Sequence, residues 1–172
     1  CVRHDELTNS KPILIAHRGL VHGSDPRIEN MPSTIYHSRS LGYDVEIDLW
    51  YINDGWWLGH DGPQWPTSIS MLDEISRGDD GAHHAWIHAK NIAALYQLRR
   101  IEWPGHYFYH QGDDAVLTST GFLWTNPGQP LTPLSICVMP EWNGLIEKCQ
   151  DLVVHGFCTD HAERIRIELG RS

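Results

Sequence analysis

Long apolar segments are missing from this sequence. Its longest apolar runs are a handful of residues, whereas a membrane-spanning helix needs roughly 18 or more. With 172 residues, 41% of them hydrophobic and 20% charged, the chain is expected to form a single globular domain over residues 1–172. No signal-peptide pattern opens the sequence. Because it starts with Cys1 rather than Met, we expect a trimmed start, with a lipid-modified cysteine as the alternative.

Basic residues are few. There are 13 Lys and Arg residues against 22 Asp and Glu residues, for a formal net charge of −9. An acidic chain of this kind is a poor partner for nucleic acids or anionic membranes, so neither is expected as a partner. An anionic substrate would need a local cluster of Arg, Lys or a metal ion.

Metal-type cysteine spacing is missing as well. The four cysteines form no CxxC pair and no zinc-like pattern. Cys137 and Cys158 fall in apparent strands, where buried free thiols are usual. We therefore expect reduced thiols and a cytoplasmic setting.

What the sequence does contain is an alternation of short apolar runs and amphipathic stretches. Repeated β–α alternation predicts a parallel sheet with helices outside it. Seven parallel strands are expected around residues 13–18, 43–50, 84–90, 106–110, 121–125, 135–139 and 155–159. Helices are expected over 31–42, 67–78, 92–103, 142–152 and 161–170, with a short one at 113–119.

Two α/β architectures accommodate this pattern, a doubly wound open sheet and a closed (β/α) barrel. The seven units favour a small TIM-type barrel, although such barrels usually take about 200 residues or more. Helices after the fourth and fifth strands must then be very short or missing. A turn at 53–55 predicts a β-hairpin inserted after the second strand.

Ionisable residues gather where these strands end, which is where α/β proteins place functional groups. Glu46 and Asp48 lie two apart on one strand, so both face the same way. Two buried carboxylates repel unless a cation compensates them, and oxygen ligands suit Mg²⁺, Ca²⁺ or Mn²⁺. The alternative is that one is exposed, or paired with Arg18 or Lys90.

Two histidines flank this carboxylate pair. His17 and His60 each stand at an apparent strand end and are candidates for a general acid–base pair. Arg18 adds a cation suited to phosphate oxygens. Metal, cations and two histidines together describe phosphodiester cleavage.

The order IAHRG, IEN, GYDVEIDLW and DGWWLGHD across residues 15–61 resembles the signature of the glycerophosphodiester phosphodiesterase family. The stretches AWIHAKN and GFCTD resemble that family's third and closing strands more loosely. The resemblance implies a TIM barrel with a hairpin after the second strand, and so favours the barrel over the open sheet. It also implies hydrolysis of a small phosphodiester through a cyclic phosphate.

Carried over by position, the resemblance assigns a role to eight residues. His17 and His60 match the catalytic pair, and which is acid and which is base stays open, with a lean to His60 as the first base. Glu46 and Asp48 match metal ligands, and Arg18 and Lys90 match phosphate contacts. Glu29 and Asn30 match a supporting pair that we expect to orient the first loop and His17.

His88 departs from the family pattern, which has a Glu ligand there. One expectation is that His88 is a third ligand, which would shift preference from Mg²⁺ or Ca²⁺ toward Mn²⁺ or Zn²⁺. Another is that Asp113, Asp114, Glu141 or Asp160 replaces it. The third is a weakened metal site in a barrel that only binds a phosphorylated ligand. A lyase or phospholipase-D-like variant is a narrower alternative.

Aromatic residues near strand ends are candidates for the pocket wall. Tyr109, Trp124 and Trp142 could face an alcohol or lipid moiety of the substrate. Ordinary packing is the alternative for each of them.

Overall fold

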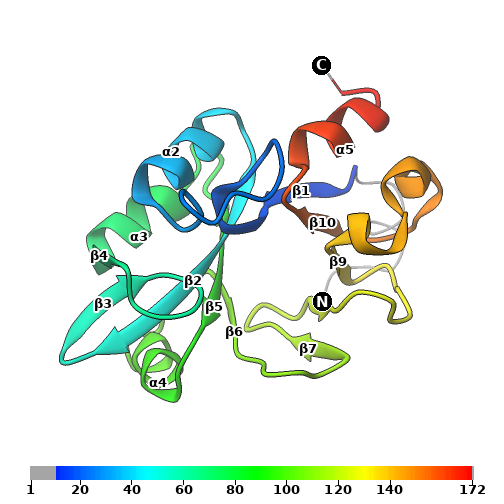
Figure 1. Cartoon of the computed structure of the whole chain (residues 1–172). Coiled ribbons are helices and arrows are strands. Elements are labelled where there is room, and N and C mark those ends of the chain that lie inside the picture. Colours follow the sequence, from blue (N-terminus) through cyan, green and yellow to red (C-terminus); the bar gives the residue numbers. More distant parts are fainter. Residues whose placement is uncertain (1–10, 172) are drawn as a thin grey trace.

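The computed structural model of the chain describes residues 11–171, so Cys1 lies outside the described residues. A curled sheet forms its centre (Figure 1). Seven strands of this sheet pair only in parallel with one another, which confirms the seven predicted strands. In spatial order they are β6 (His106–Phe108), β5 (Ala85–Ala89), β2 (Asp44–Ile52), β1 (Ile13–Ala16), β10 (Gly156–Thr159), β9 (Ser135–Val138) and β8 (Leu123–Thr125).

The order of these strands is the order of the chain with the first strand set beside the last, as in a barrel. Within residues 11–171, however, no parallel pairing closes the circle between β6 and β8. The structure therefore confirms a mixed α/β fold with a curled, partly open sheet, and it does not confirm the closed TIM-type barrel.

The space between β6 and β8 holds β7 (Ala115–Leu117), which runs antiparallel to β8. The Ser119 amide, just beyond β7, donates to the Tyr107 carbonyl on β6 at 2.9 Å. The predicted helix over 113–119 is wrong, because a short apolar run cannot distinguish a helix from a strand and here the sheet edge supplies partners.

The hairpin insertion after β2 is confirmed. Strand β3 (Gly55–Leu58) returns antiparallel along the second half of β2, and β4 (Trp65–Thr67) adds a further strand that the pattern did not predict. Asn53 and Asp54 both take positive φ values, 49° and 58°, as the turn between twisted strands requires.

Four α-helices of the described residues lie around this sheet: α2 (Pro32–Ser40), α3 (Ile69–Ser76), α4 (Ile92–Arg100) and α5 (Ala162–Glu168). Ser68 and Asn91 cap α3 and α4 by accepting hydrogen bonds from backbone amides. As expected, no α-helix follows β6 or β8 in the described chain. No helix among residues 11–171 has both the length and the apolar character needed to span a membrane.

The helix expected over 142–152 is replaced by two 3₁₀ helices, η2 (Pro140–Asn143) and η3 (Ile146–Asp151). Gly144 ends the first in the left-handed region, at φ 62°, and a single α-helix cannot continue through that conformation. A third 3₁₀ turn, η1 (His17–Gly19), follows β1.

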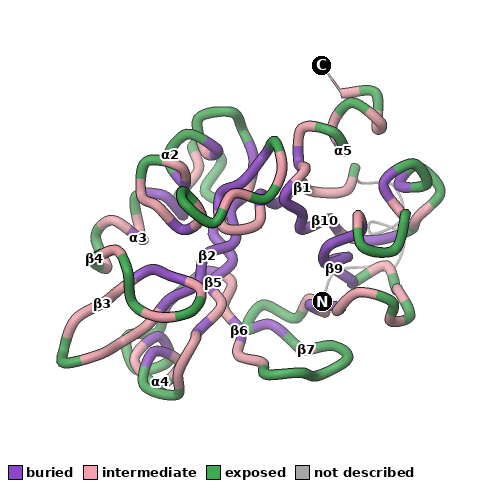
Figure 2. Tube along the Cα trace, in the orientation of Figure 1, coloured by how far each residue is buried: buried purple, intermediate pink, exposed green. Residues whose placement is uncertain are grey.

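Alternation along the strands divides the core in two. Val45, Ile47 and Leu49 of β2 face the helices within one large apolar cluster. The other face of the sheet, turned into the curl, carries a second cluster: Ile15, Trp86, Phe108, Trp124, Ile136, Val138, Met139 and Cys158. Figure 2 shows buried residues concentrated along these central strands. This inner cluster lies directly beneath the candidate functional site.

Candidate functional site

The inner face of the sheet changes from apolar to polar as the strands reach their carboxyl ends. Because side chains two apart share a face, Ile15 is followed on that face by His17, and Cys158 by Asp160. Seven residues predicted for the site line one cleft of about 630 Å³ there: His17, Arg18, Glu46, Asp48, His60, His88 and Lys90.

Two carboxylates and an imidazole form the centre of this cleft. Glu46 and Asp48 are only 2% and 1% exposed. With His88 they offer one ligand atom each, all within 4.8 Å of one another. Burial, and then repulsion by Asp48, raise the pKa of Glu46. The alternative carboxylates, including Asp160, do not join this group in the described structure.

These three residues fit a divalent cation. A buried carboxylate pair resists ionisation until a cation compensates its negative charge. The raised pKa of Glu46 indicates that the protein compensates this charge only in part. Two carboxylates with one imidazole suit Mn²⁺ or Zn²⁺ as well as Mg²⁺. Glu46 and Asp48 of β2 and His88 of β5 are therefore the residues that would hold the ion.

Asp48 is also the centre of an ion-pair network. It lies 3.0 Å from His88 Nδ1, 3.3 Å from Lys90 Nζ and 3.1 Å from Arg18 Nε; the Arg18 contact is an ion pair without hydrogen-bond geometry. Burial opposes the charge of Asp48, but the His88 hydrogen bond and then Lys90 prevail and lower its pKa. Asp48 is thus ionised without a metal, and the positive charges of Arg18 and Lys90 balance part of its negative charge.

The supporting pair contacts this network rather than His17. The Asn30 side chain donates to Asp48 Oδ2 and accepts from the Asp48 amide, both at 2.9 Å. Its own amide donates to the Arg18 carbonyl and so closes the first loop. Glu29 accepts from Arg18 Nη1 at 2.9 Å. Glu29 and Asn30 therefore fix Arg18 and Asp48.

His17 stands between two carboxylates. Its Nδ1 lies 2.7 Å from Asp160 Oδ1, and its Nε2 lies 3.9 Å from Glu46. Burial disfavours the imidazolium, but the hydrogen bond to Asp160 and the charge of Glu46 prevail and raise the pKa of His17. Nδ1 is therefore engaged by Asp160, whereas Nε2 makes no hydrogen bond within the described residues.

The turn after His17 uses two left-handed residues, Arg18 at φ 53° and Gly19 at φ 78°. A Cβ on Gly19 would come within 3.1 Å of the Ile35 backbone nitrogen, so the close approach of α2 requires glycine. The left-handed conformation of Arg18 is strained for a residue with a side chain. It directs the backbone amide of Arg18 toward Glu46 Oε2, to which the amide donates at 3.1 Å.

His60 lies across the cleft on the loop after β3. Its Nδ1 is 2.7 Å from Asp61, whose side chain is 92% exposed. Burial lowers the pKa of His60, and the charge of Arg18 adds to this effect. The two histidines therefore stand in opposite electrostatic environments, since the surroundings raise the pKa of His17 and lower that of His60.

Three further residues belong to the site. The sequence predicts Asp160 only as an alternative metal ligand, whereas in the structure its carboxylate contacts His17 Nδ1. Glu141 accepts from the Thr159 hydroxyl and the Asp160 amide, and so braces the end of β10. His110 stacks on His88 at 4.5 Å, and its pKa falls to about 4 through burial and the neighbouring His88.

Two of these residues could have been found from the alternation of side chains along a strand. His110 lies two positions after Phe108, and Asp160 two positions after Cys158, both of which face the inner side of the sheet. No comparable signal marks Glu141, because its role depends on the conformation of the turn that carries it. Of the aromatic candidates, Trp124 and Trp142 line the cleft, whereas Tyr109 packs against the outer cluster.

Comparison with protein-family models, curated proteins and solved structures gave no match for this chain. The cleft itself combines a candidate ligand group of three residues, two cations and two histidines in unlike environments.

Proposed function

We propose that the protein is a metal-dependent phosphodiesterase that hydrolyses glycerophosphodiesters or related small phosphodiesters, on a (β/α)-barrel-type fold of the glycerophosphodiester phosphodiesterase family. One observation carries the proposal. A single cleft contains a buried carboxylate pair with His88, the cations Arg18 and Lys90, and two histidines. Each component matches a requirement of phosphoryl transfer, namely charge neutralisation, a base and an acid.

The roles of the chain's own residues follow from their contacts. Arg18 and Lys90 border the cleft and bind the non-bridging phosphate oxygens. A bound divalent cation supplies further charge neutralisation at the phosphate. Glu29 and Asn30 hold Arg18 and Asp48 in place.

The two histidines move the protons. His60 takes the proton from the glycerol hydroxyl next to the phosphate, and that oxygen bonds to phosphorus. The bond to the other alcohol breaks, and His17 protonates the leaving alkoxide. Asp160 supports this role of His17 because it stabilises the imidazolium. Water then opens the cyclic phosphate with the two roles reversed, returning both histidines to their starting states.

The test is hydrolysis of glycerophosphocholine and glycerophosphoethanolamine with Mg²⁺, Ca²⁺, Mn²⁺ or Zn²⁺, followed by phosphorus NMR. Glycerol phosphate should appear with at least one metal and disappear with a chelator. A cyclic phosphate that persists would indicate a lyase instead. No turnover with any of the four metals, together with calorimetric binding of glycerol phosphate, would replace hydrolysis by a binding function.

Asp160→Asn should lower kcat by up to about 100-fold and leave KM nearly unchanged, because Asp160 acts only through His17. The acid must carry its proton, so activity falls as pH rises through the pKa of His17. Since Asp160 raises that pKa, the variant's alkaline limb should move to lower pH. Rates measured from pH 5 to 9 check this.

Asp151→Asn, an exposed residue on η3, is the matched control and should keep the parent profile. An Asp160→Asn enzyme that loses activity with an unmoved alkaline limb would contradict the positioning role.

A further inference from the structure

The cleft has two chemically different walls. The charged wall comes from η1, β2, the end of β5 with Lys90 after it, and the loop after β3. The opposite wall comes from β8, β9 and the segments after them, and it contains five apolar residues: Trp124, Pro127, Val138, Met139 and Trp142. Figure 1 shows β9 and the hairpin strand β3 at opposite sides of the molecule. The functional groups described above leave this apolar wall without a role.

Trp142 stands at the outer end of this wall on η2. It is 70% exposed, whereas Trp124, Val138 and Met139 on the same wall are 3%, 7% and 5% exposed. The wall therefore runs from the buried inner core to an indole that is mostly exposed. Large exposed aromatic residues at a cleft commonly mark a binding surface.

The turn that carries Trp142 is held in place. Met139 takes the left-handed conformation at φ 48°, with its amide donating to the Cys158 carbonyl at 2.8 Å. The Trp142 amide donates to the Met139 carbonyl at 3.0 Å. Strained backbone of this kind persists where the surroundings determine it, often at functional sites.

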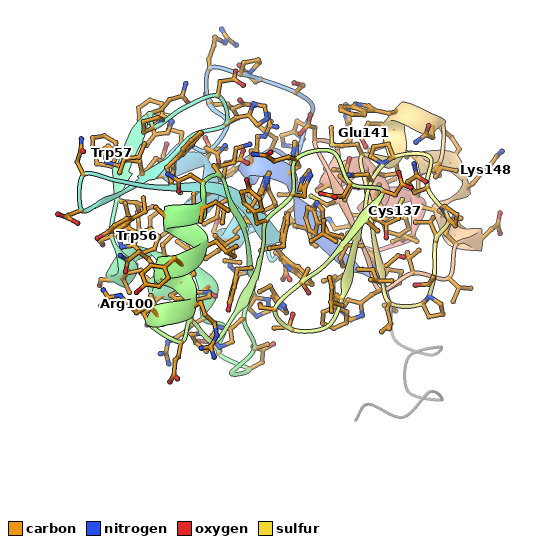
Figure 3. All side chains as sticks on the ribbon, turned by 90° about the horizontal axis from the view of Figure 1, so that it is seen from below. Trp56, Trp57, Arg100, Cys137, Glu141 and Lys148 are labelled. Carbon is orange, nitrogen blue, oxygen red and sulfur yellow. The ribbon has the colours of Figure 1, made fainter. Side chains whose placement is uncertain are left out.

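Glu141 ties the same turn to the acid–base machinery. Figure 3 shows Glu141 on the side of the molecule away from Trp56 and Trp57 of the hairpin. Its carboxylate accepts from the Thr159 hydroxyl at 2.8 Å and from the Asp160 amide at 3.1 Å. Since Asp160 holds His17 at 2.7 Å, Trp142 and His17 belong to one braced unit. The apolar wall thus lies on the side of the histidine that meets the leaving alcohol.

The lining of the wall indicates what it binds. Among the described residues of the cleft, the carboxylate on this side is Asp160, which His17 already uses. A quaternary ammonium group would find aromatic faces there but no free counter-charge. The cleft volume of about 630 Å³ lies within the range of about 300–1,000 Å³ typical of ligand pockets, which are mostly apolar.

We infer that the leaving alcohol of the substrate carries an apolar group, aliphatic or aromatic, which packs against Trp124, Met139 and Trp142. This inference rests on the proposed function and adds a substrate class to it. The phosphate and glycerol lie against the charged wall, and the apolar group extends from phosphorus toward η2. Trp142 is then a residue that determines substrate specificity.

The experiment compares three esters of glycerol phosphate that differ only in the leaving alcohol: methyl, n-octyl and choline. The octyl ester should show a kcat/KM at least about tenfold above that of the methyl ester. Trp142→Ala should remove about tenfold from kcat/KM for the octyl ester and have a much smaller effect on the methyl ester. Trp142→Phe should keep most of the preference, since a phenyl ring still offers an apolar face.

Tyr96→Ala is the matched control, because Tyr96 is a 61% exposed aromatic residue on α4 that does not line the cleft. Equal rates for methyl and octyl esters, unaffected by Trp142→Ala, would overturn the inference and leave the proposed function intact. A preference for the choline ester would also overturn it, in favour of a cation subsite.

Failure to hydrolyse all three esters would count against the proposed function instead. In that case calorimetric titration with octyl phosphate and methyl phosphate tests the wall without turnover. Tighter binding of octyl phosphate that Trp142→Ala abolishes supports the apolar subsite. Equal affinities in both proteins overturn it.

Discussion

His17→Ala and His60→Ala should each lower kcat for a glycerophosphodiester by about 10²- to 10⁴-fold, the range in which a general acid or base contributes. Each histidine is expected to serve in both steps, first as acid or base and then in the reverse role. Neither loss can therefore be bypassed in full turnover. Phosphorus NMR of substrate, cyclic intermediate and product checks both variants.

Leaving-group dependence separates the two roles. A p-nitrophenyl ester departs without protonation, so it should restore cyclisation in His17→Ala but not in His60→Ala. His37→Ala, an exposed histidine on α2, is the matched control and should retain the parent rate. Because the His17 side chain is only 14% exposed and contacts Asp160, His17→Asn with a measured unfolding curve separates lost chemistry from lost folding. Unchanged turnover in both alanine variants would reject the mechanism.

The seven parallel strands and most of the site were predictable from two simple rules, one on side-chain alternation and one on sheet topology. Alternation places Glu46 and Asp48 on one face of a strand, and strands of an α/β protein end at a common edge. Register then aligns Asp48 with His88 on the neighbouring strand. These relations involve short runs of sequence and one topological rule, so they hold without knowledge of the packing.

The relations that escaped prediction depend on distant or irregular structure. Asp160 reaches His17 across 143 positions because β10 pairs with β1, Ala16 aligning with Thr159. Nothing local to either residue specifies that pairing. The bracing by Glu141 depends on the left-handed backbone of Met139, a conformation that non-glycine residues adopt rarely and that local propensity does not predict. The strand β7 likewise depends on an unfilled sheet edge.

Asp48→Ala should destabilise the metal-free protein by about 3–5 kcal/mol, the cost of leaving a buried ion pair without one partner. Arg18 and Lys90 would keep their charges within a site where their side chains are only 18% and 14% exposed. The Asn30 amide would lose its acceptor as well. Urea unfolding at pH 7 with a chelator present measures this loss.

Glu46→Gln should have the opposite effect on stability and the same effect on metal binding. Burial and repulsion by Asp48 raise the pKa of Glu46, so its charge opposes folding above its unfolded pKa, and a neutral isostere removes that cost. The metal-free variant should then be at least as stable as the parent. Both variants lose a ligand, so Mn²⁺ should stabilise neither.

The parent protein supplies the reference for this pair. A ligand at 100 times its dissociation constant stabilises a folded protein by about 2.7 kcal/mol, so Mn²⁺ should raise the urea midpoint of the parent alone. An equal rise in Glu46→Gln would show that Glu46 is not a ligand. An Asp48→Ala protein as stable as the parent would show that the cations do not depend on Asp48. We expect opposed effects on stability because Arg18 and Lys90 neutralise Asp48, whereas the proposed metal ion would neutralise Glu46.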